Sequence, residues 1–237
     1  SIQVIPHSLI DEKQSRTLAD TLVNVSGVTP TKSQEFLFTT PIIRGFPADI
    51  YFNGLPAFGT TASADPASLA GTERIEVLKG PTSALYGGGV GAPLGGLINV
   101  VSKSPEVEPI HLIGIRKGSQ STTSTFADLN LPVGEKVNAR IAGEYQSEGS
   151  WISHVKGRQY SVQPSVSFQL SPETEILLQG KFDSRSQREY SGLPALQALS
   201  GELDRYAYPG ATSGQPLTKI KNRLLSAELR HRFSENT

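Results

Sequence analysis

Two glutamates beside an arginine are the first residues in the sequence that could do acid–base chemistry. Glu73 and Glu76 flank Arg74, and a pair of carboxylates can serve as general acid and general base. Residues 74–78 predict a β-strand, however, and side chains three positions apart on a strand point to opposite faces. The two carboxylates therefore do not converge, and we expect no catalytic site there.

A glycine run and four histidines are the other candidates for phosphate or metal binding. Residues 87–91 read Gly-Gly-Gly-Val-Gly, but neither Gly-Lys-Ser/Thr nor a capped helix follows them. The histidines have no ligand-like spacing: they are His7, His111, His154 and His231. The chain has no cysteine, so it offers no thiolate zinc site and no cysteine nucleophile. We expect no enzyme, no metal ligands and no cofactor.

The charge balance of the 237 residues argues against a nucleic-acid-binding protein, because 22 Lys and Arg face 22 Asp and Glu. Hydrophobic residues make up 37% and charged residues 19%, both low for a globular domain. The most apolar stretch, residues 95–101, is far shorter than the ~20 residues of a membrane-spanning helix. Because the chain contains no Met, we interpret Ser1 as something other than a translation start.

The first ~105 residues predict a mixed α/β domain. A strand is expected at 2–5 and a single helix at 11–22, with Leu18 and Leu22 on one face. Short strands are expected at 41–45, 49–52, 74–78 and 97–101. Asn53-Gly54 is a strong tight-turn signal, and residues 104–109 predict a linker.

From Ile110 onward the hydrophobic period changes to two, which predicts long strands with one apolar and one polar face. Six strands are expected, at 110–117, 121–131, 136–147, 158–170, 174–187 and 219–233. Their connections alternate between short turns and long loops, which is typical of outer-membrane barrels. The alternative is a soluble antiparallel sandwich, which we disfavour because strands of ten or more residues exceed the usual five or six.

We predict which surroundings each face of these strands contacts. We expect the apolar face to contact lipid: Val162, Val166, Phe168, Ile176, Leu178, Phe182, Leu225 and Leu229. We expect the polar face to line the lumen: Gln163, Ser165, Gln179, Lys181, Arg230 and Arg232.

Five motifs occur in order in the first part of the chain: IIRGF at 42–46, YFNGLP at 51–56, ERIEVLKGP at 73–81, LYG at 85–87 and GGLINVVSKSP at 95–105. Together they closely resemble the plug domain of TonB-dependent outer-membrane receptors, most of all the siderophore-receptor branch. The resemblance implies an α+β plug domain (1–105) followed by antiparallel transmembrane β-barrel strands (106–237). These would be the N-terminal part of a 22-stranded barrel, so we expect a longer receptor, with a TonB box upstream.

The resemblance implies an energy-coupled transporter of ferric siderophores in the outer membrane of a Gram-negative bacterium. Iron would be carried as the chelate, without direct protein ligands. The implied partners are a ferric siderophore, TonB, outer-membrane lipid and lipopolysaccharide. Two alternatives stay open: a receptor for cobalamin, haem or a sugar, or a structural or adhesive module without transport.

The candidate ligand-binding residues lie in three segments. Arg44 is the best fixed charge for an anionic chelate, although a structural role, pairing with Glu73 or Glu76, is an equal alternative. An apical loop would offer Phe58, Gly59, Thr60, Thr61 and Ser63. The long third loop would cover the ligand with Tyr190, Tyr206 and Tyr208.

Overall fold

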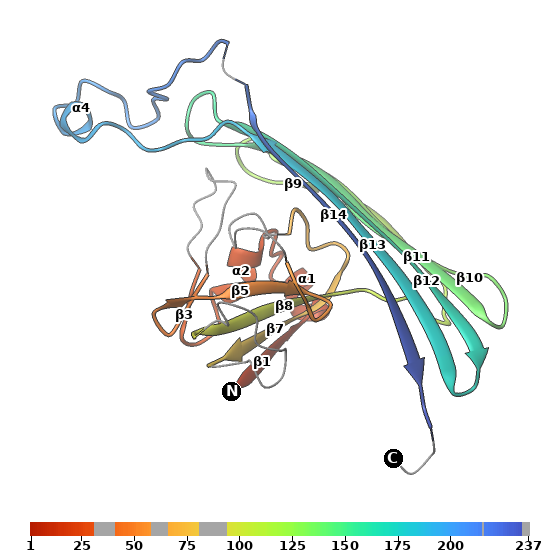
Figure 1. Ribbon diagram of the computed structural model, residues 1–237. Helices are drawn as coiled ribbons and strands as arrows, with labels where there is room; N and C mark the ends of the chain where they lie inside the picture. Colours follow the sequence, from red (N-terminus) through yellow and green to blue (C-terminus); the bar gives the residue numbers. More distant parts are fainter. Residues whose placement is uncertain (31–40, 58–65, 81–93, 215, 234–237) are drawn as a thin grey trace.

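The computed structural model describes residues 1–30, 41–57, 66–80, 94–214 and 216–233. It has two parts (Figure 1): a small α+β domain built from β1 to β8, here called the plug, and a long curved sheet of six strands, β9 to β14, here called the wall. The plug lies beside one face of the wall. Within the described residues, no helix is long and apolar enough to cross a membrane.

The plug is built on a five-stranded sheet in the order β1-β7-β8-β5-β6, in which only β5 and β8 pair in parallel. A smaller sheet joins β2, β3 and β4. The bounds are β1 (Ile2–Pro6), α1 (His7–Glu12), α2 (Leu18–Leu22), β2 (Val28–Thr29), β3 (Ile42–Ile43), β4 (Phe46–Pro47), β5 (Asp49–Phe52), β6 (Leu55–Pro56), β7 (Thr72–Lys79) and β8 (Gly96–Ser102). The strands expected at 2–5, 49–52, 74–78 and 97–101 are therefore confirmed, whereas the one expected at 41–45 is only Ile42–Ile43, because Arg44 and Gly45 have positive φ and form a turn.

The plug core is almost self-contained. Ile75 and Val77 of β7 and Ile98 of β8 are fully buried, and α2 adds Leu18 and Leu22, also fully buried. Of the wall residues, only Leu224 packs against this core as a partly buried neighbour. The plug therefore carries its own hydrophobic stabilisation.

The single helix expected at 11–22 is wrong, because the chain forms two short helices with a break between them. Gln14 adopts a positive φ of 50°, which no helix interior allows. Thr17 then caps α2: its Oγ1 accepts from the Asp20 amide at 3.2 Å, and the Asp20 carboxylate accepts from the Thr17 amide at 2.9 Å. This capping box is a start signal inside the apolar pattern, and it orients Leu18 and Leu22 into the core.

The tight turn expected at Asn53-Gly54 is confirmed as the connection between β5 and β6. Both residues have positive φ, 50° and 78°, as the favoured two-residue hairpin turn requires. The turn points toward the wall, since the Asn53 side-chain amide donates to Gln179 Oε1 at 3.1 Å. A local turn signal thereby becomes a contact between the two parts.

The wall strands are antiparallel, each paired with its sequence neighbours. Their bounds are β9 (Ile110–Lys117), β10 (Thr123–Pro132), β11 (Val137–Gly149), β12 (Lys156–Ser171), β13 (Thr174–Gln187) and β14 (Thr218–His231). All six expected strands are present, with ends shifted by a few residues at most. The long connection between β13 and β14 carries α4 (Ala195–Leu199) beyond the end of the wall (Figure 1).

The polar face of the wall is buried and the apolar face is exposed. Gln163, Ser165 and Lys181 are 5–7% exposed, whereas Leu178 is 43% and Leu225 75% exposed. Gln179 contacts the plug through Asn53. Arg230 and Arg232 are exposed near the end of β14. The outward residues Val162 and Leu229 are also exposed, and Val166, Phe168, Ile176 and Phe182 are half-buried.

Candidate functional site

The interface between plug and wall is polar on both sides. Its best-defined element is an ion cluster at the chain segment that joins the two parts. The Lys103 ammonium donates to Asp128 Oδ2 at 2.8 Å, and the Arg140 guanidinium donates to both Asp128 oxygens at 2.8 and 2.9 Å. These three side chains are only 5–6% exposed. Arg140 also reaches Glu106, at 2.6 Å.

The register of the wall explains why this cluster forms. Asp128 of β10 lies diagonally from Arg140 of β11, because Asn130 pairs with Arg140 and Asp128 with Ala142. Residues at such diagonal positions on one face are within reach of long side chains. Lys103 directly follows β8. The cluster therefore ties the end of the plug sheet to the first strands of the wall.

A second polar contact lies on the same face of the wall, nearer the long-loop ends of its strands. The Ser68 hydroxyl of the plug donates to Glu144 of β11, and Arg116 of β9 lies 3.4 Å from the same carboxylate. Arg116 also stacks on the Phe126 ring at 4.0 Å. Lys181 of β13 lies 4.9 Å from the Phe52 ring of the plug. Of these contacts, Ser68–Glu144 and Lys181–Phe52 join the plug to the wall, whereas both Arg116 contacts lie within the wall.

His7 couples the first helix of the plug to the ion cluster. Its Nε2 lies 3.0 Å from the Lys103 ammonium. Burial and, next, the Lys103 charge hold the pKa of His7 below its ordinary value, against the smaller opposing effect of Asp11. His7 is therefore neutral near pH 7, and its Nε2 lies between the Lys103 ammonium and the Asp11 carboxylate, which is 3.1 Å away.

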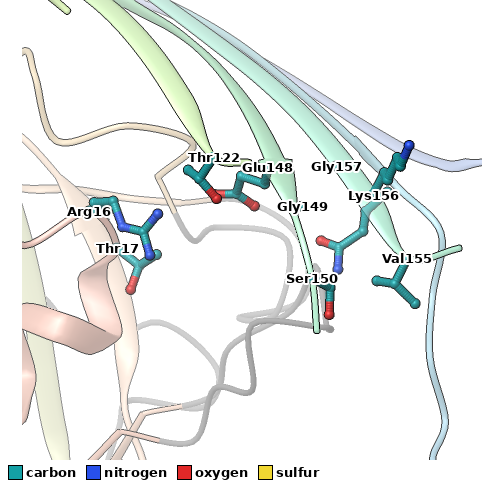
Figure 2. Close-up of a pocket in the computed structure, with 10 residues that line it drawn as sticks. Arg16, Thr17, Thr122, Glu148, Gly149, Ser150, Val155, Lys156 and Gly157 are labelled. Carbon is teal, nitrogen blue, oxygen red and sulfur yellow. The ribbon is translucent and has the colours of Figure 1, made fainter. Parts of the chain in front are cut away.

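A small pocket of about 30 Å³ lies between the plug and the long-loop ends of the wall strands. Figure 2 shows Arg16 and Thr17 on the plug side, facing Glu148, Gly149 and Ser150 across the space. Thr122, Val155, Lys156, Gly157 and Gln187 complete the lining. The same figure shows the Lys156 ammonium pointing away from Arg16. Arg16 is thus the pocket's cation on the plug side.

Aromatic and basic side chains gather in the loops beyond this pocket. Trp151 and Tyr206 meet edge to face with ring centroids 6.0 Å apart, and the Ser153 amide donates to the Tyr206 carbonyl at 2.8 Å. Arg205 lies 4.6 Å from the Tyr206 ring, and Arg188 lies 5.6 Å from the Tyr208 ring. Tyr206 therefore joins the 188–217 connection to the 150–155 loop through one ring contact and one backbone hydrogen bond.

The structure separates the candidate ligand residues. Arg44 lies exposed between β3 and β4 with φ 51°, and its amide donates to the Gly27 carbonyl at 3.0 Å. Figure 1 places β3 on the plug, far from the 188–217 connection that carries Tyr190 and Tyr206. Arg44 is therefore not brought together with these tyrosines. Five candidates, Phe58, Gly59, Thr60, Thr61 and Ser63, lie outside the described residues.

The alternative structural role for Arg44 was an ion pair with Glu73 or Glu76. Among the described residues, the Arg44 side chain makes no ion pair. Glu76 instead lies 2.7 Å from Arg74 and accepts from Asn99 at 2.9 Å. Tyr190 is half-buried and Tyr206 is 40% exposed. The ligand-binding role of all nine candidates stays a prediction.

Sequence reasoning missed Asp128, Lys103, Arg16 and Trp151. A usable signal existed for Asp128 and Arg140, because both fall on the polar face of a period-two strand. No pattern indicated Arg16, because the expected single helix placed it in a helix interior.

Comparisons with known proteins agree with this architecture. Residues 1–93 match the family model described as TonB-dependent Receptor Plug Domain. The structure superposes on Pseudomonas aeruginosa FpvA bound to a heterologous pyoverdine with a TM-score of 0.85 at 23% identity, covering 99% of this chain and 32% of that one. The siderophore receptor PiuA from Acinetobacter baumannii gives 0.83 at 24% identity, covering 100% and 34%. These likenesses confirm the expected fold class of plug followed by antiparallel strands.

Curated relatives are receptors of the same kind. The metal-pseudopaline receptor CntO of P. aeruginosa is 32% identical over 165 residues, which is 69% of this chain and 23% of the relative. The ferrichrome outer membrane transporter/phage receptor of Escherichia coli K12 is 28% identical over 203 residues, 81% and 26%. The chain thus spans about a quarter of the length of these relatives. Both relatives are named as receptors or transporters.

Proposed function

Because the chain belongs to the TonB-dependent receptors, with residues 1–93 forming their plug domain, we propose that it is the plug and first barrel strands of an outer-membrane receptor that imports a ferric siderophore. One observation carries the proposal. The plug lies on the polar, buried face of strands whose apolar face is exposed, an arrangement that suits a wall between lipid and a closed lumen.

The chemistry of the interface supports gating. Plug and wall meet through ion pairs and hydrogen bonds such as Lys103–Asp128 and Asn53–Gln179, which water can replace at modest cost. A plug held by apolar packing would expose that surface each time it moved. We propose that TonB supplies the work by pulling on the plug, in which β1 is an edge strand of the five-stranded sheet.

The ligand class rests on the long-loop end and on the relatives. Arg16, Arg188 and Arg205 offer positive charge there, and Trp151 and Tyr206 offer aromatic surface, which together suit an anionic chelate with planar groups. Several relatives are named as receptors of iron chelates, among them a ferrioxamine receptor and a ferripyoverdine receptor. We propose that iron enters inside its chelator, which supplies all the metal ligands.

The test is uptake by the full-length receptor in a strain lacking its own siderophore receptors. Cells take up radioactive iron presented as hydroxamate, catecholate and peptide-type chelates, each in a TonB-containing and a TonB-deficient background. We expect TonB-dependent uptake of at least one ferric chelate. TonB-dependent uptake of cobalamin, haem or a sugar alone would replace the proposal, and no uptake of any probe by surface-exposed receptor would favour a structural or adhesive module.

The relative named as a metal-pseudopaline receptor favours a second candidate, a receptor for metal chelates other than ferric ones. The same assay therefore includes nickel and zinc loaded on aminocarboxylate chelators. Uptake of these with no uptake of ferric chelates would establish the second candidate.

Two substitutions test the binding site in the same cells. Phe58→Ala tests the segment of the apical loop, and Arg44→Gln tests the charge; both are compared at equal surface abundance. We expect Phe58→Ala to weaken chelate binding. Unchanged affinity would remove the apical loop from the site, whereas loss of folded Arg44→Gln receptor would assign Arg44 a structural role.

A further inference from the structure

Two charged side chains lie buried on the inner face of β13. Lys181 and Asp183 are each 5% exposed, and Lys181 Nζ lies 3.3 Å from Asp183 Oδ2. Within the described part of the chain, neither Lys181 Nζ nor either carboxylate oxygen of Asp183 has a hydrogen-bond partner. Buried polar groups of folded proteins are nearly always hydrogen-bonded, so this pair is an exception that points to a further partner.

The Asp128 cluster shows how a structural ion pair differs from this one. Asp128 accepts three hydrogen bonds from Lys103 and Arg140 at 2.8–2.9 Å, and these bonds join the plug to the wall. Lys181 and Asp183 both belong to β13, so their contact with each other joins no two elements. Stabilisation of the closed receptor therefore does not account for this pair.

The pair faces the plug at the end of β5. Lys181 Nζ lies 4.9 Å from the centroid of the Phe52 ring, and Phe52 is itself 8% exposed. The face of an aromatic ring attracts a cation but offers nothing to a carboxylate. Separation of the plug from β13 would therefore open the pair to water or to a solute, either of which can supply the missing hydrogen bonds.

A continuous strip of polar side chains surrounds the pair. Asp183 lies directly opposite Ser161 of β12, and Gln187, at the long-loop end of the strip, lines the pocket of Arg16. Hydroxyl and amide side chains can exchange hydrogen bonds with a passing solute without an apolar surface to retain it. We call the following inner-face residues the polar strip: Gln159, Ser161, Gln163 and Ser165 of β12, and Gln179, Lys181, Asp183, Arg185 and Gln187 of β13.

We propose that the chelate passes between the plug and the polar strip, and that Lys181 and Asp183 bind it on the way. The proposal rests on the proposed function, because only a plug that leaves β13 opens the strip. Lys181 would donate to anionic oxygens of the chelate, and Asp183 would accept from its N–H or O–H groups. Because the two charges compensate each other, the site can bind the chelate without trapping it, as passage requires.

Capture of a reactive chelate tests the route. The full-length receptor, free of other cysteines, carries Ser161→Cys, which lies directly opposite Asp183 and replaces a side chain that is 1% exposed. The matched control is Ser124→Cys on β10, where the serine is 4% exposed. The probes are ferric hydroxamate, catecholate and peptide-type chelates, each coupled to a thiol-reactive group. They are given to cells with and without TonB.

We expect TonB-dependent capture of at least one probe at Ser161→Cys, at least about tenfold above capture at Ser124→Cys, because a buried thiol reacts only where the route exposes it. Absence of TonB-dependent capture at Ser161→Cys would overturn the proposal. Equal capture at the two positions would also overturn it, by showing a route that does not follow the polar strip.

Substitution of Lys181 tests binding on the way, separately from binding at the surface. Lys181→Gln leaves Asp183 as a lone negative charge on the route. We therefore expect the maximal uptake rate of an anionic chelate to fall at least about fivefold at equal surface abundance. The half-saturating concentration should change by less than about twofold, because the first binding step lies elsewhere. Lys181→Arg keeps the charge and should retain most of the rate.

Unchanged uptake by Lys181→Gln, or a change in half-saturating concentration alone, would refute the role of the pair. The same cells separate this proposal from the transport function. A wild type that imports none of the probes refutes the transport function. Import by the wild type without capture at Ser161→Cys refutes only the passage along the polar strip.

Discussion

Replacing Asp128 by Asn should loosen the plug from the wall. Asp128 is the only carboxylate within 3 Å of both Lys103 and Arg140 in the described structure, and it accepts three hydrogen bonds from them at 2.8–2.9 Å. Asn keeps the shape but removes the charge. Two buried cations then face each other without their common counterion.

The size of the effect follows from burial. Removing one partner of a buried ion pair costs about 3–5 kcal/mol, because an uncompensated charge stays inside. Arg140 keeps Glu106 at 2.6 Å, Lys103 keeps His7 at 3.0 Å, and Asn still offers one acceptor. We therefore expect Asp128→Asn to destabilise the contact between plug and wall by the lower end of this range, about 3 kcal/mol. The population of molecules in which plug and wall are apart should then be roughly 100-fold larger.

The assay uses a buried thiol as the reporter of opening. The chain has no native cysteine, and Ser161 on the inner face of β12 is 1% exposed, so Ser161→Cys introduces one reporter in this part of the receptor. Its rate of reaction with a water-soluble thiol reagent measures how often the plug leaves the wall. Asp128→Asn should raise that rate about 100-fold.

Glu106→Gln is the matched control. Glu106 also pairs with Arg140, but it is 52% exposed, so its loss should change the rate less than about fivefold. Equal effects of the two substitutions, or less than a threefold change for Asp128→Asn, would refute the assignment of the buried cluster as a tie between plug and wall.

Three further predictions concern the plug. Since the pKa of His7 is lowered in the folded protein, the unfolded chain takes up more protons, so the plug should be fully stable above about pH 6.5 and lose stability as pH falls below it; urea titrations from pH 7.5 to 5.5 should show this loss in the wild type and a flatter response in His7→Gln. Thr17→Ala removes the cap of α2 and should lower the free energy of unfolding by about 1 kcal/mol, seen in urea titration of the plug, with Thr29→Ala as an exposed control. Gly96→Ala should abolish folded receptor at the cell surface, because φ is 133° and a Cβ there would overlap the Leu78 carbonyl oxygen; normal surface abundance would contradict this packing.

The wall was predictable because its two faces contact different surroundings. Alternation in residues such as Tyr160 to Leu170 fixes both the strand and its orientation, so the six strands and their buried polar face follow from the pattern. The plug strands were shorter, yet Asn53-Gly54 located one hairpin through the φ values that this turn demands.

The prediction of a single helix at 11–22 was wrong because the spacing of apolar residues does not show where a helix is interrupted. The Thr17–Asp20 capping box does show it, since it marks the start of a new helix. The ligand site could not be assembled from sequence, because the distance between Arg44 and Tyr206 depends on the tertiary fold. The structure places them on separate parts of the molecule. The pairing of Asp128 with Lys103 was equally hidden, because it joins the end of one domain to the second strand of another.

The nearly self-contained core of the plug bears on the order in which the receptor is built. A domain whose apolar residues pack among themselves can fold in water before the strands enter a membrane, and the surface that it later turns to the wall is already suited to water. The wall has the opposite character, since many of its outward side chains are apolar and exposed. Assembly can then proceed as the closing of strands around a finished body, so that errors in strand insertion need not propagate into the folding of the plug.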